Sequence, residues 1–323
     1  MISTDVLIVG GGPAGSSCAA RLKQRGLDCL VLDRVDFPRV KLCAGWVTPE
    51  VISDLRMEKS EYPHSFFTFE TTVVHLYGMT FRLKAPQHSI RRTEFDAWLL
   101  KRSGAPVRKH QVRDIRCEDG TYVVDDQYRA KFLVGAGGTR CPVFRRLFRN
   151  DNPRAKSLQA VALESEFKNE WRDGDCHLWF FHKGLPGYAW YVPKQNGYLN
   201  IGIGGIATRL KSRRDDIKDY WQSFVEKLES QGLVSASVPE PGGYSYYLRA
   251  DVDTPRIDNA FVVGDAAGLA TRDLCEGIGP AVRSGYAAAD AIALDSEYDI
   301  SDINRHSLSG SLMGRYLDYR FCH

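Results

Sequence analysis

Three closely spaced glycines near the N-terminus constrain this chain more than any other feature of its sequence. Gly10, Gly12 and Gly15 form the pattern G-x-G-x-x-G, which Ala19 and Gly26 extend. The apolar run 5–9 precedes these glycines, residues 16–25 have helical character, and a second apolar run follows at 29–32. The sequence therefore predicts a βαβ unit with a tight glycine turn between its first strand and its helix.

Each glycine of this turn has its own physical task. Gly10 permits the tight turn, Gly12 lets the backbone approach a pyrophosphate, and Gly15 allows the helix to press on the sheet. The amides and the dipole at the helix N-terminus then face the phosphates. Asp33 ends the second strand, where its carboxylate can accept hydrogen bonds from an adenosine ribose. We therefore expect the N-terminal residues to bind the ADP half of a dinucleotide.

A second motif separates FAD from NAD. An apolar strand at residues 260–263 leads into Gly264 and Asp265, and a small-residue helix is expected around residues 281–293. Flavoproteins use such a junction to reach the ribityl chain, where Asp265 would bond a hydroxyl and the following amides would face the phosphate and the flavin. Gly277 and Ile278 offer further backbone beside a ring system. The two motifs together favour FAD.

The remaining patterns define the fold class. Apolar spacing predicts a helix at 93–101, a strand meander at 106–135, aromatic-rich strands at 157–206, and a helix at about 213–228. We expect an α/β protein in which a discontinuous Rossmann-like FAD-binding domain accompanies a mixed β-sheet substrate domain. The expected FAD-binding domain comprises residues 1–75, 90–155 and 252–300, and the substrate-binding domain comprises 76–89 and 156–251. Residues 301–323 form a short C-terminal extension.

Composition disfavours several other classes of protein. The net charge of +3 is small beside 43 basic and 40 acidic residues, which argues against a nucleic-acid partner. The 8 cysteines include no C-x-x-C pair and no cysteine-histidine cluster at zinc-ligand spacing, so we expect no metal site. No apolar run approaches the roughly 18 to 20 residues that span a bilayer, and no secretory signal is recognisable. We expect a cytoplasmic protein that can also contact a membrane peripherally.

Four further segments add to the glycine fingerprint. They are Phe37-Pro38-Arg39-Val40-Lys41-Leu42-Cys43-Ala44-Gly45, Arg92-Thr93-Glu94-Phe95-Asp96, Tyr188-Ala189-Trp190-Tyr191-Val192-Pro193, and Gly264-Asp265-Ala266-Ala267-Gly268 with Cys275-Glu276-Gly277-Ile278. With these segments the sequence resembles the geranylgeranyl reductase family within the p-hydroxybenzoate hydroxylase-like flavoproteins, from residue 5 to about residue 293.

The resemblance implies roles for several residues. It implies that Cys43 faces the flavin, that Arg92 helps to hold FAD, and that Tyr188 and Trp190 line the substrate cavity; whether Arg91 or Arg92 faces FAD stays open. The expected cofactor-binding residues are Gly10, Gly12, Pro13, Ala14, Gly15, Asp33, Arg34, Arg39, Cys43, Ala44, Arg92, Gly264, Asp265, Gly277 and Ile278. The expected catalytic residues are Cys43, Lys41, Tyr188 and Trp190.

The implied reaction is reduction of carbon-carbon double bonds in an isoprenoid or a similarly apolar small molecule by reduced flavin. Two alternatives stay open. The first is an oxygen-using flavin monooxygenase or a flavin-dependent halogenase. Residues 37–41 also resemble the lysine-bearing segment of some flavin-dependent halogenases, in which case Lys41 would carry or activate hypohalous acid. A non-catalytic flavin electron carrier is the second alternative.

Two features bear on the electron donor and the substrate site. Relatives usually have G-A-D-G where this chain has Gly135-Ala136-Gly137-Gly138, which leaves open whether NADPH or another external donor, such as an electron-donor protein, reduces the flavin. The chain has little sequence after its last expected FAD helix, which predicts a short or open substrate site.

Overall fold

A computed structural model describes residues 1–235, 237–308 and 311–322, and these residues form two units. The first unit contains residues 1–39, 96–155 and 247–315. The second contains residues 40–95, 156–246 and 316–323, of which the structure describes all but 236 and 323. Residues 40–75 fall in the second unit because the strand at 66–76 pairs there along its length, whereas the sequence had suggested the first unit for them.

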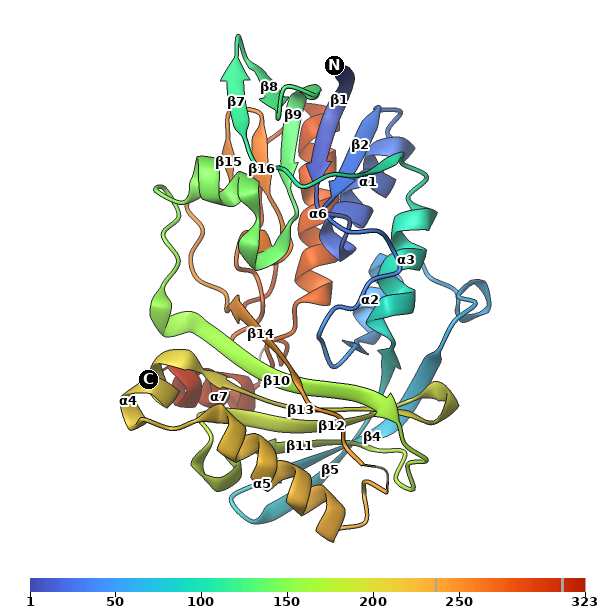
Figure 1. The fold of residues 1–323 in the computed structure, drawn as a ribbon, viewed down its shortest axis with the longest axis vertical. Helices are drawn as coiled ribbons and strands as arrows, with labels where there is room; N and C mark the ends of the chain where they lie inside the picture. Colours follow the sequence, from blue (N-terminus) through green and yellow to red (C-terminus); the bar gives the residue numbers. More distant parts are fainter. Residues whose placement is uncertain (236, 309–310, 323) are drawn as a thin grey trace. The chain divides into compact units, whose positions relative to one another are not determined.

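The first unit contains an eight-stranded sheet, and its main strand order is β15-β16-β9-β1-β2-β6 (Figure 1). Strands β1, β2, β6, β9 and β16 run parallel, as a Rossmann-like sheet requires, and β7 and β8 form an antiparallel meander on β9. The strands are β1 (Ile2–Val9), β2 (Cys29–Asp33), β6 (Val107–Lys109), β7 (Ile115–Glu118), β8 (Thr121–Val124), β9 (Tyr128–Gly135), β15 (Arg256–Ile257) and β16 (Ala260–Val262).

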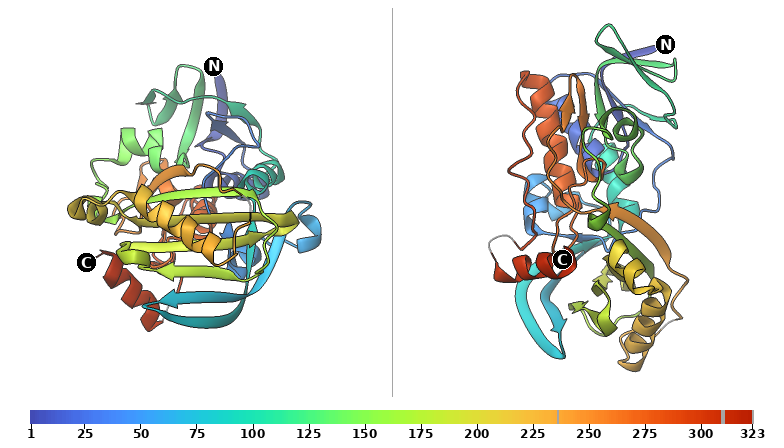
Figure 2. Two further views of the ribbon diagram at one scale, coloured as in Figure 1. Left: turned by 60° about the horizontal axis from the view of Figure 1, so that its bottom comes forward. Right: turned by 90° about the vertical axis from the view of Figure 1, so that its left-hand side faces the viewer.

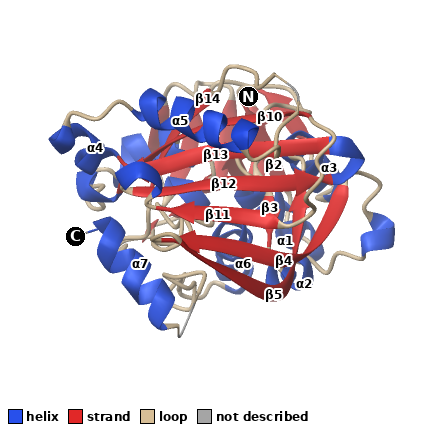
Figure 3. Ribbon diagram, turned by 90° about the horizontal axis from the view of Figure 1, so that it is seen from below, coloured by secondary structure: helices blue, strands red, loops and turns tan. Residues whose placement is uncertain are grey.

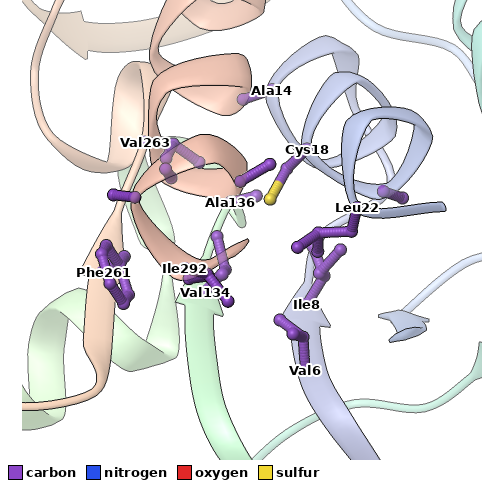
Figure 4. Close-up of a cluster of buried hydrophobic side chains, with 14 of the residues drawn as sticks. Val6, Ile8, Ala14, Cys18, Leu22, Val134, Ala136, Phe261, Val263 and Ile292 are labelled. Carbon is purple, nitrogen blue, oxygen red and sulfur yellow. The ribbon is translucent and has the colours of Figure 1, made fainter. Parts of the chain in front are cut away.

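Helices α1 (Pro13–Gln24) and α6 (Ile278–Leu294) lie side by side on this sheet (Figure 1). Figure 4 shows Cys18 and Leu22 of α1 with Ile292 of α6 beside the strand residues Val6 and Ile8. Because a Cβ on Gly285 would lie 2.3 Å from the carbonyl oxygen of Ala14, only glycine permits this separation of the helices. Burial of this apolar cluster stabilises the unit.

The second unit contains another eight-stranded sheet, in the order β14-β10-β13-β12-β11-β4-β5-β3 (Figure 3). All of its neighbouring pairs with a described register are antiparallel except β4 with β11, so the sheet is mixed. The strands are β3 (Trp46–Val47), β4 (Phe66–Leu76), β5 (Met79–Ile90), β10 (Gln159–Lys168), β11 (Cys176–Phe180), β12 (Gly187–Lys194), β13 (Tyr198–Ile206) and β14 (Gly242–Tyr247).

Helix α5 (Ile217–Ser230) covers one face of this second sheet (Figure 2). Its apolar stripe includes Trp221 and Phe224, which pack in one buried cluster with Tyr191 and Ile201 of the sheet. The other helices are α2 (Pro49–Asp54), α4 (Ala207–Arg213), α7 (Leu312–Cys322) and α3 (Arg92–Arg102), which begins in the second unit and continues into the first. No helix among the described residues is long and apolar enough to cross a membrane.

The predicted α/β class is confirmed, with the aromatic-rich strands at 157–206 observed as β10 to β13. The single helix predicted at 213–228 is wrong at its start, because Arg214 adopts a left-handed conformation (φ 61°) that ends α4. Helix α5 then begins after Asp216, whose carboxylate accepts a hydrogen bond from the Lys218 N–H. Helix α6, predicted around residues 281–293, begins at Ile278, and a loop separates it from Asp265.

Candidate functional site

The predicted glycine turn lies in the first unit between β1 and α1. Gly10 has φ of +116°, and a Cβ there would lie 2.3 Å from the carbonyl oxygen of Ala136. A Cβ on Gly15 would lie 1.9 Å from the carbonyl oxygen of Gly10, so α1 presses directly on the turn. Helix α1 follows Gly12, which provides no side-chain cap, and its first amides therefore remain available to a phosphate.

Asp33 closes β2 next to this turn. One of its carboxylate oxygens accepts a hydrogen bond from the Gly11 N–H at 2.8 Å, and the other accepts one from the Val35 N–H at 3.2 Å. The carboxylate therefore helps to hold the glycine turn. It is half-buried and retains lone pairs for an adenosine ribose. Its neighbour Arg34 is exposed.

Arg39 lies against the same turn. Its guanidinium is 3.3 Å from the position that a Cβ on Gly12 would occupy, and it forms an ion pair at 3.2 Å with Asp96 of α3. The Asp96 side chain is completely buried, and the Arg39 guanidinium also lies 4.9 Å from the centre of the Phe37 ring. A cation is thus fixed at the turn that approaches a pyrophosphate. Sequence reasoning missed Asp96, although an acid in a largely buried helix segment was a usable signal.

The second predicted cofactor segment lies at the ends of β16 and α6. Gly264 has φ of +57° and fits between Ala14 of α1 and Ala281 of α6. Its N–H donates a hydrogen bond to the Ser284 hydroxyl at 2.9 Å. The carboxylate of Asp265 lies 3.3 Å from the position that a Cβ on Gly277 would occupy, directly before Ile278 begins α6. The structure therefore brings the two FAD motifs of the first unit together through α1 and α6.

This arrangement fits an FAD molecule. Cβ atoms at Gly10 and Gly15 would collide with backbone, so the close approach of chain segments is built into the fold. The uncapped start of α1 and the Arg39 guanidinium supply positive potential for a pyrophosphate. Asp33 and Asp265 supply acceptors suited to ribose and ribityl hydroxyls.

The remaining predicted residues lie in the second unit, and two of them, Cys43 and Ala44, belong to a loop at residues 43–45, which we call the cysteine loop. The Cys43 N–H donates to a carboxylate oxygen of Glu164 at 2.5 Å, and the Lys194 ammonium donates to the carbonyl oxygen of Ala44 at 2.7 Å. Gly45 has φ of +67°, and a Cβ there would lie 2.1 Å from the carbonyl oxygen of Ile90. The loop is thus fixed at each of its residues.

Two buried ionisable side chains support the cysteine loop. Burial raises the pKa of the Glu164 carboxyl to about 7, while the Cys43 N–H and the Lys194 ammonium act in the opposite direction. Burial lowers the pKa of Lys194, and the nearby Glu166 opposes that shift. Lys194 lies 3.6 Å from the Glu166 carboxylate, which also accepts a hydrogen bond from Arg91 at 2.8 Å. The charges of this buried group therefore compensate one another.

Trp190 and Tyr188 lie on β12 and share one face of the second sheet. The indole N–H of Trp190 donates to the side-chain oxygen of Asn200 at 2.8 Å, and the Asn200 amide donates to the Cys43 carbonyl oxygen at 3.5 Å. The Tyr188 ring contacts Phe180 at 5.4 Å and stacks on Phe321 at 6.3 Å between ring centres. Trp190 is therefore linked to the cysteine loop, and Tyr188 belongs to an aromatic cluster.

Lys41 and the two arginines at the start of α3 have different surroundings. The Lys41 ammonium lies 3.2 Å from the centre of the Tyr244 ring and donates to the Leu42 carbonyl oxygen at 3.3 Å. Arg91 pairs with Glu166 and also forms an ion pair at 3.3 Å with Glu94, whereas Arg92 is the more buried of the two. Arg91 therefore belongs to the charge network of the second sheet.

Sequence reasoning missed Glu164, Lys194 and Asn200, which the structure places around Cys43. Each lies on a strand next to at least one apolar residue. The available signal was a polar or charged residue on a strand next to apolar residues. Buried polar groups need hydrogen-bond partners, so such a position indicates a buried polar network.

Comparisons with known proteins agree with this geometry. Residues 3–58 match the family model described as FAD binding domain, and residues 159–247 match the geranylgeranyl reductase catalytic domain. The first match contains the glycine turn, Arg39 and the cysteine loop. The second contains Glu164, Trp190, Lys194 and Asn200.

Several curated proteins are similar along most of the chain. An uncharacterised protein of Methanosarcina barkeri is 31% identical over 310 residues, which cover 92% of this chain and 76% of that protein. Digeranylgeranylglycerophospholipid reductase 2 of Methanosphaera stadtmanae is 26% identical, with 98% of this chain and 85% of the relative covered. Menaquinone reductase of Mycobacterium tuberculosis is 28% identical, with 90% and 76% covered.

Solved structures show the same fold. A geranylgeranyl bacteriochlorophyll reductase-like protein of Thermoplasma acidophilum superposes with a TM-score of 0.80 at 22% identity, covering 91% of this chain and 79% of that one. A flavin-dependent brominase gives 0.71 at 22% identity, with the same coverage. The fold is thus shared by reductases and halogenases, and the sequence relationships distinguish them. The protein is an FAD-dependent oxidoreductase, and the chain belongs to the geranylgeranyl reductase family.

Proposed function

We propose that this protein reduces carbon-carbon double bonds in an isoprenoid chain or a similarly apolar small molecule. The observation that carries the proposal is the apolar face of the second sheet on which Tyr188 and Trp190 lie. Directly paired residues share a face, and Trp190 pairs with Leu178 while Tyr188 pairs with Phe180. The same face continues through Val74 and Leu76 on β4. Apolar side chains of this kind suit a hydrocarbon substrate.

The relatives support the same substrate class. The region that contains this face matches the geranylgeranyl reductase catalytic domain. Two of the similar proteins are named digeranylgeranylglycerophospholipid reductase and menaquinone reductase. We extend only the apolar, isoprenoid character of those substrates to this chain. A lipid substrate would require a cytoplasmic protein to meet the membrane surface.

We assign the cofactor to the residues predicted from the sequence. Gly10, Gly12, Pro13, Ala14 and Gly15 would hold the pyrophosphate with Arg39 and Arg34, and Asp33 would bind the adenosine ribose. Gly264, Asp265, Gly277 and Ile278 would hold the ribityl and flavin end. Cys43, Ala44 and Arg92 are the other residues that we propose to bind FAD. When bound, FAD supplies the hydride for the reduction.

The chain's own residues would orient the substrate and provide a proton. Tyr188 and Trp190 would hold the double bond in position and exclude water. The Cys43 thiol or the Tyr188 hydroxyl would donate the proton. Lys41 is the fourth residue proposed to be catalytic. Its contact with Tyr244 would keep the ammonium in a fixed position.

We propose an external electron donor, either NADPH or a donor protein. A Cβ on Gly137 would lie 3.1 Å from the Cα of Cys141, so an acidic side chain at this position would require the chain at Cys141 to shift. Mixing the oxidised enzyme anaerobically with NADPH or with a reduced ferredoxin-type protein, and following the flavin absorbance, would distinguish the two donors.

The function is tested with chemically reduced enzyme under anaerobic conditions. Digeranylgeranyl lipid or menaquinone would be added in detergent, and mass spectrometry would detect the gain of two hydrogens for each saturated double bond. Formation of the saturated product supports the proposal. If reduced enzyme leaves every isoprenoid unchanged yet halogenates an aromatic compound with oxygen and halide, and Lys41→Ala abolishes that halogenation, the halogenase alternative replaces it.

A further inference from the structure

The cysteine loop is held by side chains that are far away in the sequence. Glu164 on β10 accepts the Cys43 N–H, and Lys194 at the end of β12 donates to the carbonyl oxygens of Ala44 and Ile90 at 2.7 and 2.5 Å. Lys194 is completely buried, and Glu164 is 6% exposed. Buried ionisable groups are costly unless hydrogen bonds compensate for their lost hydration. The hydrogen bonds of Glu164 and Lys194 to this loop and its neighbours provide that compensation.

Asn200 connects this support to the substrate strand. Its side-chain oxygen accepts the Trp190 indole N–H at 2.8 Å, which fixes the orientation of the amide. The amide nitrogen is thereby directed toward the Cys43 carbonyl oxygen at 3.5 Å and also interacts with Glu164. An indole N–H is only a donor, so it orients the amide in one way. Direct contacts thus lead from Trp190 through Asn200 to the Cys43 carbonyl oxygen, and from Asn200 through Glu164 to the Cys43 N–H.

The packing of Trp190 reinforces this path. A Cβ on Gly202 would lie 2.1 Å from an indole ring carbon, and Gly202 pairs with Trp190 on one side and with Glu164 on the other. Glycine therefore allows the indole to lie flat across β13 toward the strand that carries Glu164. The indole N–H contacts Asn200 directly, and no side chain at position 202 lies between them.

We propose that Glu164, Lys194 and Asn200 are positioning residues that hold the cysteine loop, and that Asn200 couples the position of Trp190 to Cys43. The inference deepens the proposed function, because the residue expected to line the substrate cavity would then set the conformation of the residue expected to face the flavin. A substrate that presses on Trp190 would adjust the Cys43 loop through Asn200.

The loop conformation is measured by alkylation of Cys43 with iodoacetamide in the FAD-loaded protein, followed by peptide mass spectrometry. Cys117 is exposed on β7 in the first unit and serves as an internal reference. Glu164→Ala removes the acceptor of the Cys43 N–H and should change the Cys43 rate about tenfold relative to Cys117, the effect of one lost hydrogen bond to an ionisable group. Glu164→Gln keeps an acceptor oxygen and should restore most of the wild-type rate.

Lysine and tryptophan variants test the other contacts. Lys194→Met should change the Cys43 rate, whereas the control Lys168→Met, which loses a surface hydrogen bond to the Asn196 carbonyl oxygen, should not. Trp190→Phe keeps an aromatic ring but removes the indole N–H together with part of the ring system. Its effect on the Cys43 rate should vanish in an Asn200→Leu background, because the path then no longer exists.

The outcomes separate this inference from the proposed function. If folded Glu164→Ala and Trp190→Phe proteins both alkylate Cys43 at the wild-type rate, the positioning role is overturned even where isoprenoid reduction is intact. If Glu164→Ala does not fold, the milder Trp190→Phe and its double variant still decide the coupling. Loss of isoprenoid reduction in every variant, with unchanged Cys43 alkylation rates, would also contradict the positioning role. Altered Cys43 alkylation rates in a protein that reduces no isoprenoid would overturn only the proposed function.

Discussion

Gly202 lies directly beneath the indole ring of Trp190, and a Cβ at that position would lie 2.1 Å from a ring carbon. Gly204 lies two residues further along the same strand, and a Cβ there would lie 3.5 Å from a carbon of the same ring. The first distance is a collision, and the second is ordinary van der Waals contact. Substitution by alanine should therefore displace the indole at Gly202 and leave it in place at Gly204.

Gly202→Ala should displace the indole and lower the free energy of unfolding by about 1 to 3 kcal/mol, the usual effect of overpacking. The near-ultraviolet circular dichroism of the tryptophans should change with it. Gly204→Ala serves as the matched control and should leave both nearly unchanged. Equal effects of the two substitutions, in urea unfolding and in the spectrum, would show that the indole is not confined as described.

A second pair of glycines separates folding from cofactor binding. A Cβ on Gly15 would lie 1.9 Å from the Gly10 carbonyl oxygen, whereas a Cβ on Gly12 would meet only the end of the Arg39 side chain at 3.3 Å. Gly15→Ala should therefore destabilise the apoprotein by about 1 to 3 kcal/mol. Gly12→Ala should leave the apoprotein melting temperature close to wild type and weaken FAD binding, since the backbone there approaches the pyrophosphate.

Thermal unfolding of the apoproteins and titration with FAD, followed by flavin fluorescence, measure the two quantities independently. The prediction fails if Gly12→Ala destabilises the apoprotein as strongly as Gly15→Ala does.

The two parts of the candidate site differ in how far the sequence could predict them. The glycine turn and Asp33 lie within one βαβ unit, so local spacing predicted both of them, and the structure adds the hydrogen bond from the Gly11 N–H to Asp33. The support of Cys43 depends instead on Glu164, which is 121 residues away, and the Ala44 contact depends on Lys194 at a separation of 150. Strand order and register create those contacts, and neither can be deduced from spacing along the chain.

The sheet topology also explains the differences in domain assignment. Residues 66–76 pair with both β5 and β11, and the latter pairing is parallel and spans about a hundred residues of sequence. No turn signal encodes such a pairing. Local patterns therefore predicted most of the elements, while the membership of residues 40–75 depended on a long-range contact.

The carboxyl of Glu164 should make the stability of the protein decrease as pH rises. Its pKa is about 7 in the folded protein and 4.5 as the ordinary value, so the folded state binds the proton more tightly than the unfolded chain. Between these two values the folded state holds more protons, and the free energy of unfolding falls with increasing pH. The full effect corresponds to about 3 kcal/mol.

Glu164→Gln removes this titration. The stability of the wild-type protein relative to Glu164→Gln should therefore be greatest near about pH 5 and smallest near about pH 8. Urea unfolding of both proteins across this range measures the difference, in which the other titrating groups cancel. A difference that is constant with pH would mean that Glu164 titrates normally.

A histidine pair should produce the opposite dependence on pH. Nε2 of His75 lies 3.0 Å from Nδ1 of His177, and Nε2 of His177 lies 3.0 Å from the Asp173 carboxylate. Burial, the neighbouring His177 and Lys227 lower the pKa of His75 to about 4, and burial also lowers that of His177. Between pH 6.5 and about pH 4 the unfolded chain therefore binds more protons at His75 than the folded protein does.

Stability from this pair is therefore complete above about pH 6.5 and is lost as pH falls toward about 4. His75→Gln keeps a side chain able to hydrogen-bond Thr80 and His177 but cannot be protonated. The variant should lose less stability than the wild type between these pH values in thermal melts. His64→Gln, at an exposed histidine of the same unit, should follow the wild type. If His75→Gln and wild type lose stability in parallel on acidification, the His75 ring is protonated in the folded protein as readily as in the unfolded chain, and its contact with His177 does not oppose charging.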